Sequence, residues 1–377
     1  MMLVAGIITF LYVFVLLFLL YGYHQVPEFT GKNSAPNTPF SIIIPFRDEA
    51  ENLPQLLKSL SRLHYPAHLF EILLVNDASE DASEEICSSF IRAHPRMKIR
   101  LLQNERHTGS PKKDAVKTAI SEANFDHILT TDADCTMPAT WLEVFDSFIA
   151  ESGADLVAAP VRLREDTGEK GFWKRFQELD IFSLQTATVG GFGVKIPFMC
   201  NGANLCYSKN GFLKVQGFEG NENIGSGDDI FLLEKFNREG LKTRFLKSQA
   251  AVVTTHPQPD LKSLVAQRIR WAAKTSAYKS PFGKFVGLIV LLMNLTLVTA
   301  VGGFLLNQTE PETLFLLFVF KFNADFALIY ASAKLFDREK VLKSYFQASL
   351  VYPFFSSYVA ILSLFRGYNW KGRQFKK

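Results

Sequence analysis

Long apolar runs mark both ends of the chain. Residues 3–21 carry no charge, with no basic stretch before them and no cleavage signal after them. Because about 20 apolar residues span a bilayer, this run predicts an uncleaved N-terminal transmembrane anchor over residues 1–23. Three further runs predict C-terminal transmembrane helices within residues 284–366, namely 285–306, 314–335 and 345–365. Lys321 and Asp325 interrupt one run, and their spacing predicts an ion pair that faces the other helices.

Between these runs, residues 38–280 alternate short apolar segments with amphipathic ones. The apolar segments predict strands at residues 40–46, 70–75, 98–102 and 125–131. The amphipathic segments predict helices at residues 51–63, 79–93 and 112–123. Buried strands separated by helices indicate an α/β fold, with a Rossmann-like, mostly parallel sheet and helices on both faces. Ligands bind such sheets at the carboxyl ends of the strands, so the residues that follow each strand are the candidates for a site.

The charge pattern predicts how the chain is oriented. The net charge is +4, and basic residues beside the apolar runs account for it without a nucleic-acid partner. Five basic residues precede the second run: Arg268, Arg270, Lys274, Lys279 and Lys284. Basic residues stay on the cytoplasmic side, which predicts an integral membrane protein with residues 38–280 in the cytoplasm. If the source is bacterial, the membrane is the cell inner membrane. The basic tail at 367–377 then falls on the far side, so either the span count differs by one or the tail departs from the rule.

Two acids follow the last predicted strand. Asp132 and Asp134 lie one residue apart at its carboxyl end. Two carboxylates at one strand end repel each other unless a cation or a proton intervenes. Oxygen ligands alone favour Mg²⁺ or Mn²⁺ over zinc, and such a metal can stabilise a departing diphosphate. The alternative is that both acids only cap the following turn.

Asp77 closes the second predicted strand. A carboxylate there can accept ribose hydroxyls or the uracil N–H of a nucleotide, or it can cap the next helix. The segment from Pro45 through Phe46 to Glu49, which closes the first strand, contains no glycine. That argues against a nicotinamide-binding turn. Lys112 begins a predicted helix, where it can approach an anion or remain solvated.

A second acidic pair and a cationic segment lie further along. Asp228 and Asp229 open a helix after a glycine-rich stretch, so one can serve as general base toward an acceptor hydroxyl while the other caps the helix. Gln267, Arg270 and Trp271 share one helical face. The arginine can pair with departing phosphate oxygens and the indole can stack on a sugar ring. The alternative for this helix is a positive, aromatic border to the membrane.

These motifs, in their order between residues 41 and 271, resemble those of the membrane-integrated inverting glycosyltransferases of family 2, the group of cellulose synthase, hyaluronan synthase and ceramide glucosyltransferase. The resemblance implies a GT-A fold. It implies that Pro45, Phe46, Glu49 and Asp77 line the nucleoside pocket, with Lys112 near the donor.

The same resemblance assigns the remaining residues. Asp132 and Asp134 match the DxD motif, the first toward the nucleotide and the second toward the metal. Asp229 takes the position of the base, with Asp228 beside it at the acceptor and diphosphate. The motif QxxRW is matched by Gln267, Arg270 and Trp271. The passage 201–204 resembles the loop that shapes the acceptor site.

The implied activity is that of a metal-dependent, inverting hexosyltransferase. A nucleotide-sugar, expected to be UDP-linked, would donate to a membrane-associated lipid or glycan acceptor with Mg²⁺ or Mn²⁺ as cofactor. Few predicted spans favour a lipid acceptor over a polymer channel. Three alternatives remain at this point: a processive synthase of an exported polysaccharide, a non-catalytic membrane scaffold, and a nucleotidyltransferase. The last would need a glycine-rich phosphate loop.

Overall fold

The computed structural model describes residues 2–31, 35–165, 171–365, 367–371 and 373–375. Parts of the last predicted segments, residues 366, 372, 376 and 377, lie outside the described residues. The chain divides into two units. The sheet unit comprises Pro27–Arg164 and Met199–His256, and the helical unit comprises Met1–Val26, Glu165–Phe198 and Pro257–Lys377.

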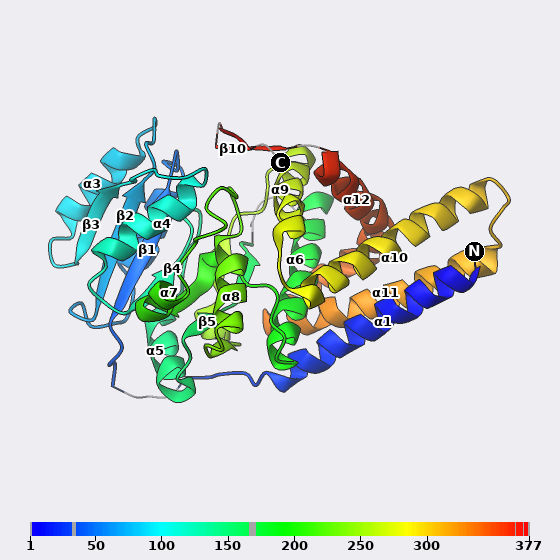
Figure 1. Ribbon diagram of the computed structural model, residues 1–377, viewed down its shortest axis with the longest axis horizontal. Coiled ribbons are helices and arrows are strands. Elements are labelled where there is room, and N and C mark those ends of the chain that lie inside the picture. The colour runs from blue at the N-terminus through cyan, green and yellow to red at the C-terminus, as the bar shows by residue number, and fades with distance from the viewer. Residues whose placement is uncertain (1, 32–34, 166–170, 366, 372, 376–377) are drawn as a thin grey trace. The chain divides into compact units, whose positions relative to one another are not determined.

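The sheet unit is built on one large sheet. Among the described residues this sheet has seven strands, in the order β3-β2-β1-β4-β7-β5-β8 (Figure 1). The strands are β1 Phe40–Phe46, β2 Phe70–Asn76, β3 Ile99–Gln103, β4 His127–Thr130, β5 Leu156–Ala158, β7 Leu205–Ser208 and β8 Thr243–Phe245. Parallel pairing joins β1 to both β2 and β4, and β2 to β3, whereas β7 runs antiparallel to β4 and β5. A separate parallel pair joins β6 (Val161–Leu163) to β9 (Val253–Thr255). The predicted mostly parallel sheet is confirmed.

Helices cover both faces of this sheet, as predicted. The helices of the unit are α2 Leu53–Leu60, α3 Ser83–Ala93, α4 Pro111–Glu122, α5 Trp141–Ser152, α7 Lys209–Lys214 and α8 Asp228–Arg238. Every second residue of β1 from Phe40 to Phe46 packs into one apolar cluster with α2, α3 and α5. Helix α4 contacts β1 and β2 without joining that cluster, which places it on the opposite face. Strand β1 is buried on both sides, and this explains its continuous apolar sequence.

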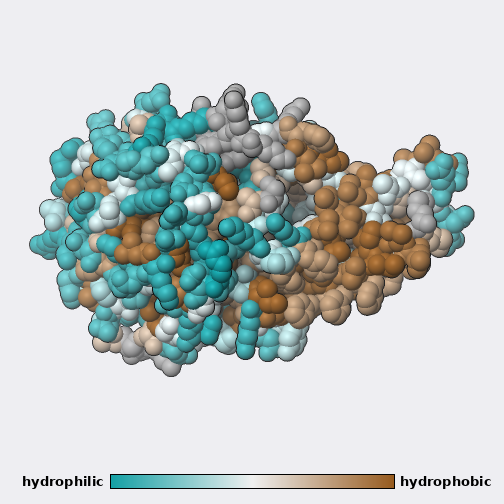
Figure 2. Space-filling model, viewed as in Figure 1, coloured by the Kyte–Doolittle hydropathy of each residue, from teal (hydrophilic) through white to brown (hydrophobic). Residues whose placement is uncertain are grey.

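The helical unit contains the long apolar helices. Its helices are α1 Met2–Gln25, α6 Phe172–Gly193, α9 Leu261–Ala273, α10 Pro281–Leu305, α11 Pro311–Leu335 and α12 Tyr345–Phe365. Within the described part of the chain, four helical segments are long and apolar enough to cross a membrane, namely α1, α10, α11 and the segment Glu339–Phe365 that contains α12. They coincide with the four predicted apolar runs. Figure 2 shows hydrophobic residues gathered where Figure 1 draws α1, α10 and α11.

Charged side chains inside these apolar helices are paired. Lys321 and Asp325 of α11 form the predicted ion pair, and the Lys321 side chain is only 4% exposed. The Tyr12 hydroxyl of α1 donates to Asp325, and Lys321 Nζ donates to the Tyr12 oxygen at 3.1 Å. The ammonium also lies 5.3 Å from the ring centre of Tyr352 in α12. This polar cluster therefore connects three helices, as the cost of an unpaired charge in an apolar setting requires.

Glycine allows α1 and α6 to pack with their backbones in contact. A Cβ atom added to Gly190 would lie 2.2 Å from the carbonyl oxygen of Leu19, and one added to Gly193 would lie 1.8 Å from that of Gly22. Both obstacles are backbone atoms, which cannot rotate away. Small residues at such crossings permit the close approach that stabilises helix pairs in apolar surroundings.

We predict that Gly190→Ala destabilises the protein. The added methyl group forces α1 away from α6, at a cost of about 1–3 kcal/mol for overpacking. Thermal unfolding in detergent should show a lower midpoint. The matched control is Gly287→Ala on α10, where a Cβ atom meets nothing within 4 Å. Equal midpoints for the two variants would contradict the close crossing.

Candidate functional site

The predicted acids gather where the strand order of the sheet reverses. Strands β2 and β3 lie on one side of β1, and β4 lies on the other. The carboxyl ends of these parallel strands therefore face one crevice, the usual ligand site of such sheets. Asp77 follows β2, and Asp132 and Asp134 follow β4.

The loops that follow β1 and β2 hold each other in place. The backbone N–H of Asp48 donates to Ser79 Oγ at 3.1 Å, and that of Glu49 donates to Ser83 Oγ at 2.8 Å. Asp48 and Ala78 adopt left-handed backbone conformations, with φ of 52° and 53°. Such conformations persist in non-glycine residues only where neighbouring contacts enforce them. This edge of the crevice is therefore preformed.

Pro45 and Phe46 end β1 beneath these loops. Phe46 is 3% exposed and packs into the apolar cluster of the sheet. Its carbonyl oxygen accepts the backbone N–H of Asp77 at 2.9 Å. The side chain of Phe46 thus belongs to the core, and a ligand would meet only its backbone.

Asp77 is held by two residues that sequence reasoning missed. Its Oδ1 atom accepts from Arg106 Nε at 2.6 Å and from Asn104 Nδ2 at 2.7 Å. Asn104 Nδ2 also donates to the carbonyl oxygen of Pro111, the residue before Lys112. Both partners follow the end of β3, so the strand-end rule that selected Asp77 could have found them. A nucleoside at Asp77 would share its carboxylate with Arg106.

Lys112 joins the two acidic motifs. Its ammonium lies 2.7 Å from Asp132 Oδ1 and 3.3 Å from Asp228 Oδ2. Burial lowers the pKa of Lys112, but the charges of Asp132 and Asp228 outweigh burial and raise it. The lysine therefore remains a cation between the end of β4 and the start of α8. Its side chain is 23% exposed, so the pair lies at an accessible surface.

Asp229 is oriented by the backbone of the 201–204 passage. Its Oδ2 atom accepts the backbone N–H of Gly202 at 3.1 Å, and its Oδ1 atom accepts that of Ile230 at 2.8 Å. A Cβ atom on Gly202 would lie 3.2 Å from Asp228 Oδ2 and 3.7 Å from Lys112 Nζ. The absence of a side chain at position 202 thus keeps space beside the acids. The structure brings the predicted acceptor loop and the predicted base together.

The surroundings of Asp134 disfavour its charged form and raise its pKa. Burial, the charge of Asp132 and the charge of Glu49 together raise the pKa of Asp134 to about 6. Its carboxylate accepts from Thr255 Oγ1 at 3.2 Å and from the Cys135 thiol at 3.4 Å. These neutral donors only partly offset the repulsion between the acids.

The chemistry of the site fits a hard divalent cation. In the part of the chain that the structure describes, no three His, Cys, Asp or Glu side chains converge into a complete metal site. Mg²⁺ commonly uses one or two carboxylates together with water and substrate phosphates. Asp134 and Asp132 offer such a pair, and the raised pKa of Asp134 shows that a positive charge would relieve the repulsion there. The two residues that were predicted as metal ligands are therefore suited to that task.

Gln267, Arg270 and Trp271 belong to α9 of the helical unit. Their neighbour Arg268 was predicted only to contribute to the orientation of the chain in the membrane. It is a buried cation, 7% exposed. Its Nε donates to Asp180 Oδ2 at 2.7 Å, and its guanidinium lies 4.2 Å from the ring centre of Trp271. It also donates to Gln267. Arg268 thereby fixes two residues of the motif.

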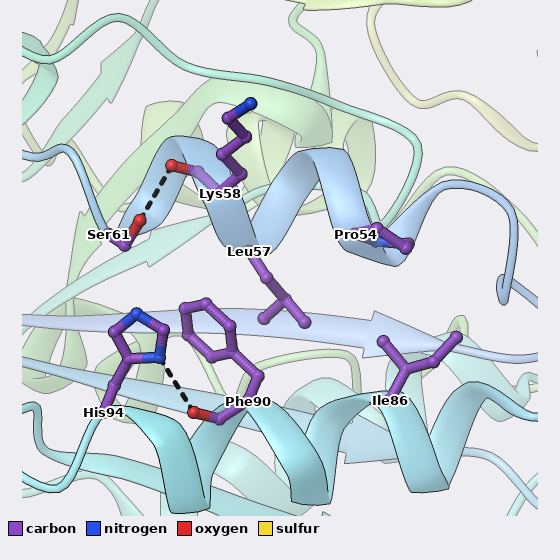
Figure 3. A pocket seen from close by; sticks show the side chains of 7 residues that line it. All are labelled: Pro54, Leu57, Lys58, Ser61, Ile86, Phe90 and His94. Atoms are coloured by element: carbon purple, nitrogen blue, oxygen red, sulfur yellow. Dashed lines mark hydrogen bonds between the residues drawn. The ribbon is translucent and has the colours of Figure 1, made fainter.

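A shallow groove of about 400 Å³ lies away from the acids, between α2 and α3. Figure 3 shows the residues that line it: Pro54, Leu57, Lys58, Ser61, Ile86, Phe90 and His94. No predicted site residue is among them. The groove is mainly apolar, and Lys58 is the lysine among its lining residues.

Comparison with known proteins gives one family. The family model described as Glycosyl transferase family 21 matches residues 3–376. Glycosyltransferase AglE of Haloferax volcanii is 31% identical over 131 residues, which are 34% of this chain and 42% of that protein. Dolichyl-phosphate beta-glucosyltransferase of Dictyostelium discoideum is 31% identical over 121 residues, 29% of this chain and 36% of that protein. The matches thus span less than half the length of these curated relatives.

The fold is shared with solved structures. Among them is the mannosyltransferase PcManGT from Pyrobaculum calidifontis in complex with GDP-Man and Mn²⁺. The TM-score is 0.59 at 17% sequence identity, and the alignment covers 93% of this chain and 98% of that one. The predicted GT-A-type architecture is confirmed at the level of the fold.

We predict that Asp134→Asn stabilises the metal-free protein at high pH. Because the pKa of Asp134 is raised to about 6 in the folded state, its ionisation opposes folding once the pH rises through that value. Thermal unfolding with a chelator present should show a gain of about 1–3 kcal/mol at pH 8. The gain should fade toward pH 4, where the carboxyl group is protonated in the folded state.

Asp132→Asn provides the comparison, since it relieves the same repulsion but also removes the ion pair with Lys112. Its gain at pH 8 should therefore be smaller than that of Asp134→Asn. A pH-independent effect of Asp134→Asn would show that the repulsion is absent.

Proposed function

The chain belongs to glycosyl transferase family 21, and we propose that it transfers one sugar from a nucleotide-sugar to a hydroxyl group of a lipid acceptor. The observation that carries the proposal is the position of Lys112. Its ammonium contacts both Asp132 and Asp228, so one cation lies between the two acidic motifs. Separate acidic clusters that only cap helices would not share a cation.

On the donor side, we assign the nucleoside to the loop after β1 and to Asp77. Pro45, Phe46 and Glu49 would border it through the segment that the β2 loop holds in place. Arg106 beside Asp77 adds a positive charge to this edge. The donor is expected to be UDP-linked, and Lys112 would lie beside its diphosphate.

Asp134, with Asp132, would hold a Mg²⁺ or Mn²⁺ ion. Such an ion would neutralise charge on the diphosphate as it departs. The oxygen-only donor pair and the raised pKa of Asp134 support this assignment.

Asp229 is proposed as the general base. Its carboxylate would take the proton of the acceptor hydroxyl while the oxygen attacks the anomeric carbon from the side opposite the nucleotide, which inverts that carbon. The hydrogen bond from Gly202 N–H orients the carboxylate. The QxxRW motif alone supports a role for Gln267, Arg270 and Trp271. In this role Arg270 would pair with the departing diphosphate.

The lipid acceptor follows from the apolar helices. Four helical segments of the described chain suit a membrane, and one relative is named for dolichyl phosphate. A lipid phosphate is already anionic and needs no base, whereas a hydroxyl does. The proposed base therefore favours a lipid hydroxyl. The basic residues around α9 support a cytoplasmic sheet unit in an integral membrane protein.

The decisive experiment is a donor and acceptor panel with purified protein in detergent. UDP-, GDP- and dTDP-sugars are each incubated with diacylglycerol, ceramide or a polyprenyl phosphate, with Mg²⁺, Mn²⁺ or a chelator. We expect nucleotide release and a lipid carrying a single sugar, only with a hydroxyl lipid and a metal. A long glycan product would support a processive synthase instead. No release from any donor by folded protein would refute the proposal.

We predict that Asp229→Asn removes turnover and leaves donor binding nearly intact. Loss of a general base costs roughly 10²- to 10⁴-fold in rate. The affinity for UDP with metal present and kcat should be measured on the same sample. Asp228→Asn is the matched control, because it alters the pair with Lys112 rather than the base. Equal loss of UDP affinity and turnover in Asp229→Asn would contradict the assigned role.

A further inference from the structure

Lys113, the residue after Lys112, is a buried cation that faces away from the acids described above. Lys113 is only 1% exposed. The Nζ atom donates to the carbonyl oxygen of Asn221 at 2.6 Å and to that of Ile224 at 2.9 Å. An ammonium is costly to bury unless hydrogen bonds replace its water. Both acceptors lie in the segment 218–227, here called the α8 loop, which leads directly into Asp228.

Two aromatic rings at the ends of the α8 loop also surround this ammonium. Lys113 Nζ lies 4.9 Å from the ring centre of Phe231 and 5.9 Å from that of Phe218. Phe218 begins the loop, and Phe231 lies in the first turn of α8. A cation near an aromatic face gains about 0.5–2 kcal/mol. One ammonium therefore contacts the beginning and the middle of the loop and the first turn of α8.

The α8 loop contains glycines, which allow many backbone conformations. It therefore needs contacts that fix its shape. Gly220 and Gly227 have left-handed φ values of 79° and 84°. Gly227 is the N-cap of α8 and supplies no capping side chain. Glycine loses much conformational freedom on folding, so the loop has little intrinsic preference for this shape.

A second lysine holds the preceding segment. Lys235 of α8 donates to the carbonyl oxygens of Gly217 and Glu219, each at 2.8 Å. Lys113 continues this pattern toward Asp228 from a different helix. The backbone carbonyls of the α8 loop are thus organised by ammonium groups on both of its sides.

We propose that Lys113 is a positioning residue of the proposed transfer reaction, on which this inference rests. It fixes the α8 loop so that α8 presents Asp228 and Asp229 next to Lys112. Adjacent helical residues point about 100° apart, so the first turn of α4 can direct Lys112 to the acids and Lys113 to the loop. Helix α4 thereby couples the donor-side Asp132 to the acceptor-side pair.

The test compares Lys113→Met with Lys209→Met. Lys209 also donates to a backbone carbonyl, that of Ala123 at 2.8 Å, but outside the α8 loop. A misplacement of about 1 Å can cost 10²-fold in rate, so we expect kcat to fall by roughly 10- to 100-fold in Lys113→Met. The KM for the donor should hardly change. Lys113→Arg should recover part of kcat, because its guanidinium also donates to carbonyls. Lys209→Met should keep the parent kcat.

Hydrogen exchange of the amides in the α8 loop, without substrates, gives a readout that does not depend on activity. Exchange should accelerate in Lys113→Met and stay at the parent rate in Lys209→Met. If Lys113→Met does not fold, Phe231→Leu weakens the cation–π contact alone and should shift kcat and exchange in the same direction by less.

The two proposals fail in different ways. Unaltered exchange in the loop, or a donor KM that rises in step with the loss of kcat, would overturn the role of Lys113. A parent protein that turns over no donor would overturn the proposed function, while the exchange data would still decide whether Lys113 orders the loop.

Discussion

Repulsion between carboxylates at the carboxyl edge of the main sheet is the constraint on which the site depends. Burial, together with the charges of Asp132 and Glu49, raises the pKa of Asp134 to about 6. Asp228 and Asp229 add to the negative charge from the start of α8, and Lys112 contacts one acid of each group. Such an arrangement lowers the stability of the ligand-free fold. It becomes favourable when a cation or a cationic complex of a diphosphate enters.

The surroundings of the acids are correspondingly rigid. The loops after β1 and β2 exchange hydrogen bonds, and each contains a left-handed residue, Asp48 and Ala78. For alanine this conformation costs about 1–2 kcal/mol. Because the contacts across the loops enforce it, the strand ends keep one shape before a ligand arrives. Preorganised charge of this kind is what stabilises a developing negative charge without rearrangement.

Local pattern was sufficient to predict the first half of the sheet. The predicted strands at 40–46, 70–75 and 98–102 match β1, β2 and β3 within one residue at each end. These strands are buried on both faces or pack against helices, so their apolar runs are continuous. Beyond β4 the strands are short: β5 spans only Leu156–Ala158 in the main sheet, and β6, three residues later, pairs with β9 instead. Strand β7 was not predicted, because its four residues between β4 and β5 are selected by tertiary pairing.

The site residues also divide into some that the sequence predicted and others that were missed. Acids directly after strands were found, since position alone identifies them. Asn104 and Arg106 follow the end of β3 and were overlooked, whereas the role of Lys113 depends on which groups the fold places opposite it. A lysine in a first helical turn is usually solvated, and nothing local distinguishes Lys112, which meets carboxylates, from Lys113, which meets backbone carbonyls.

In the helical unit, buried charges form ion pairs, unlike the group of acids around Asp134. Lys321 meets Asp325 and Tyr12, and Arg268 meets Asp180, so these ions are matched by partners of opposite charge. In the sheet unit Asp134 instead lies near two further acids, Asp132 and Glu49, whose charges add to the rise in its pKa. Ion pairs hold helices in register, whereas a group of like charges retains affinity for an external cation. By this criterion Arg268 is a structural residue within the QxxRW segment, and Arg270 remains the arginine to which a ligand role is assigned.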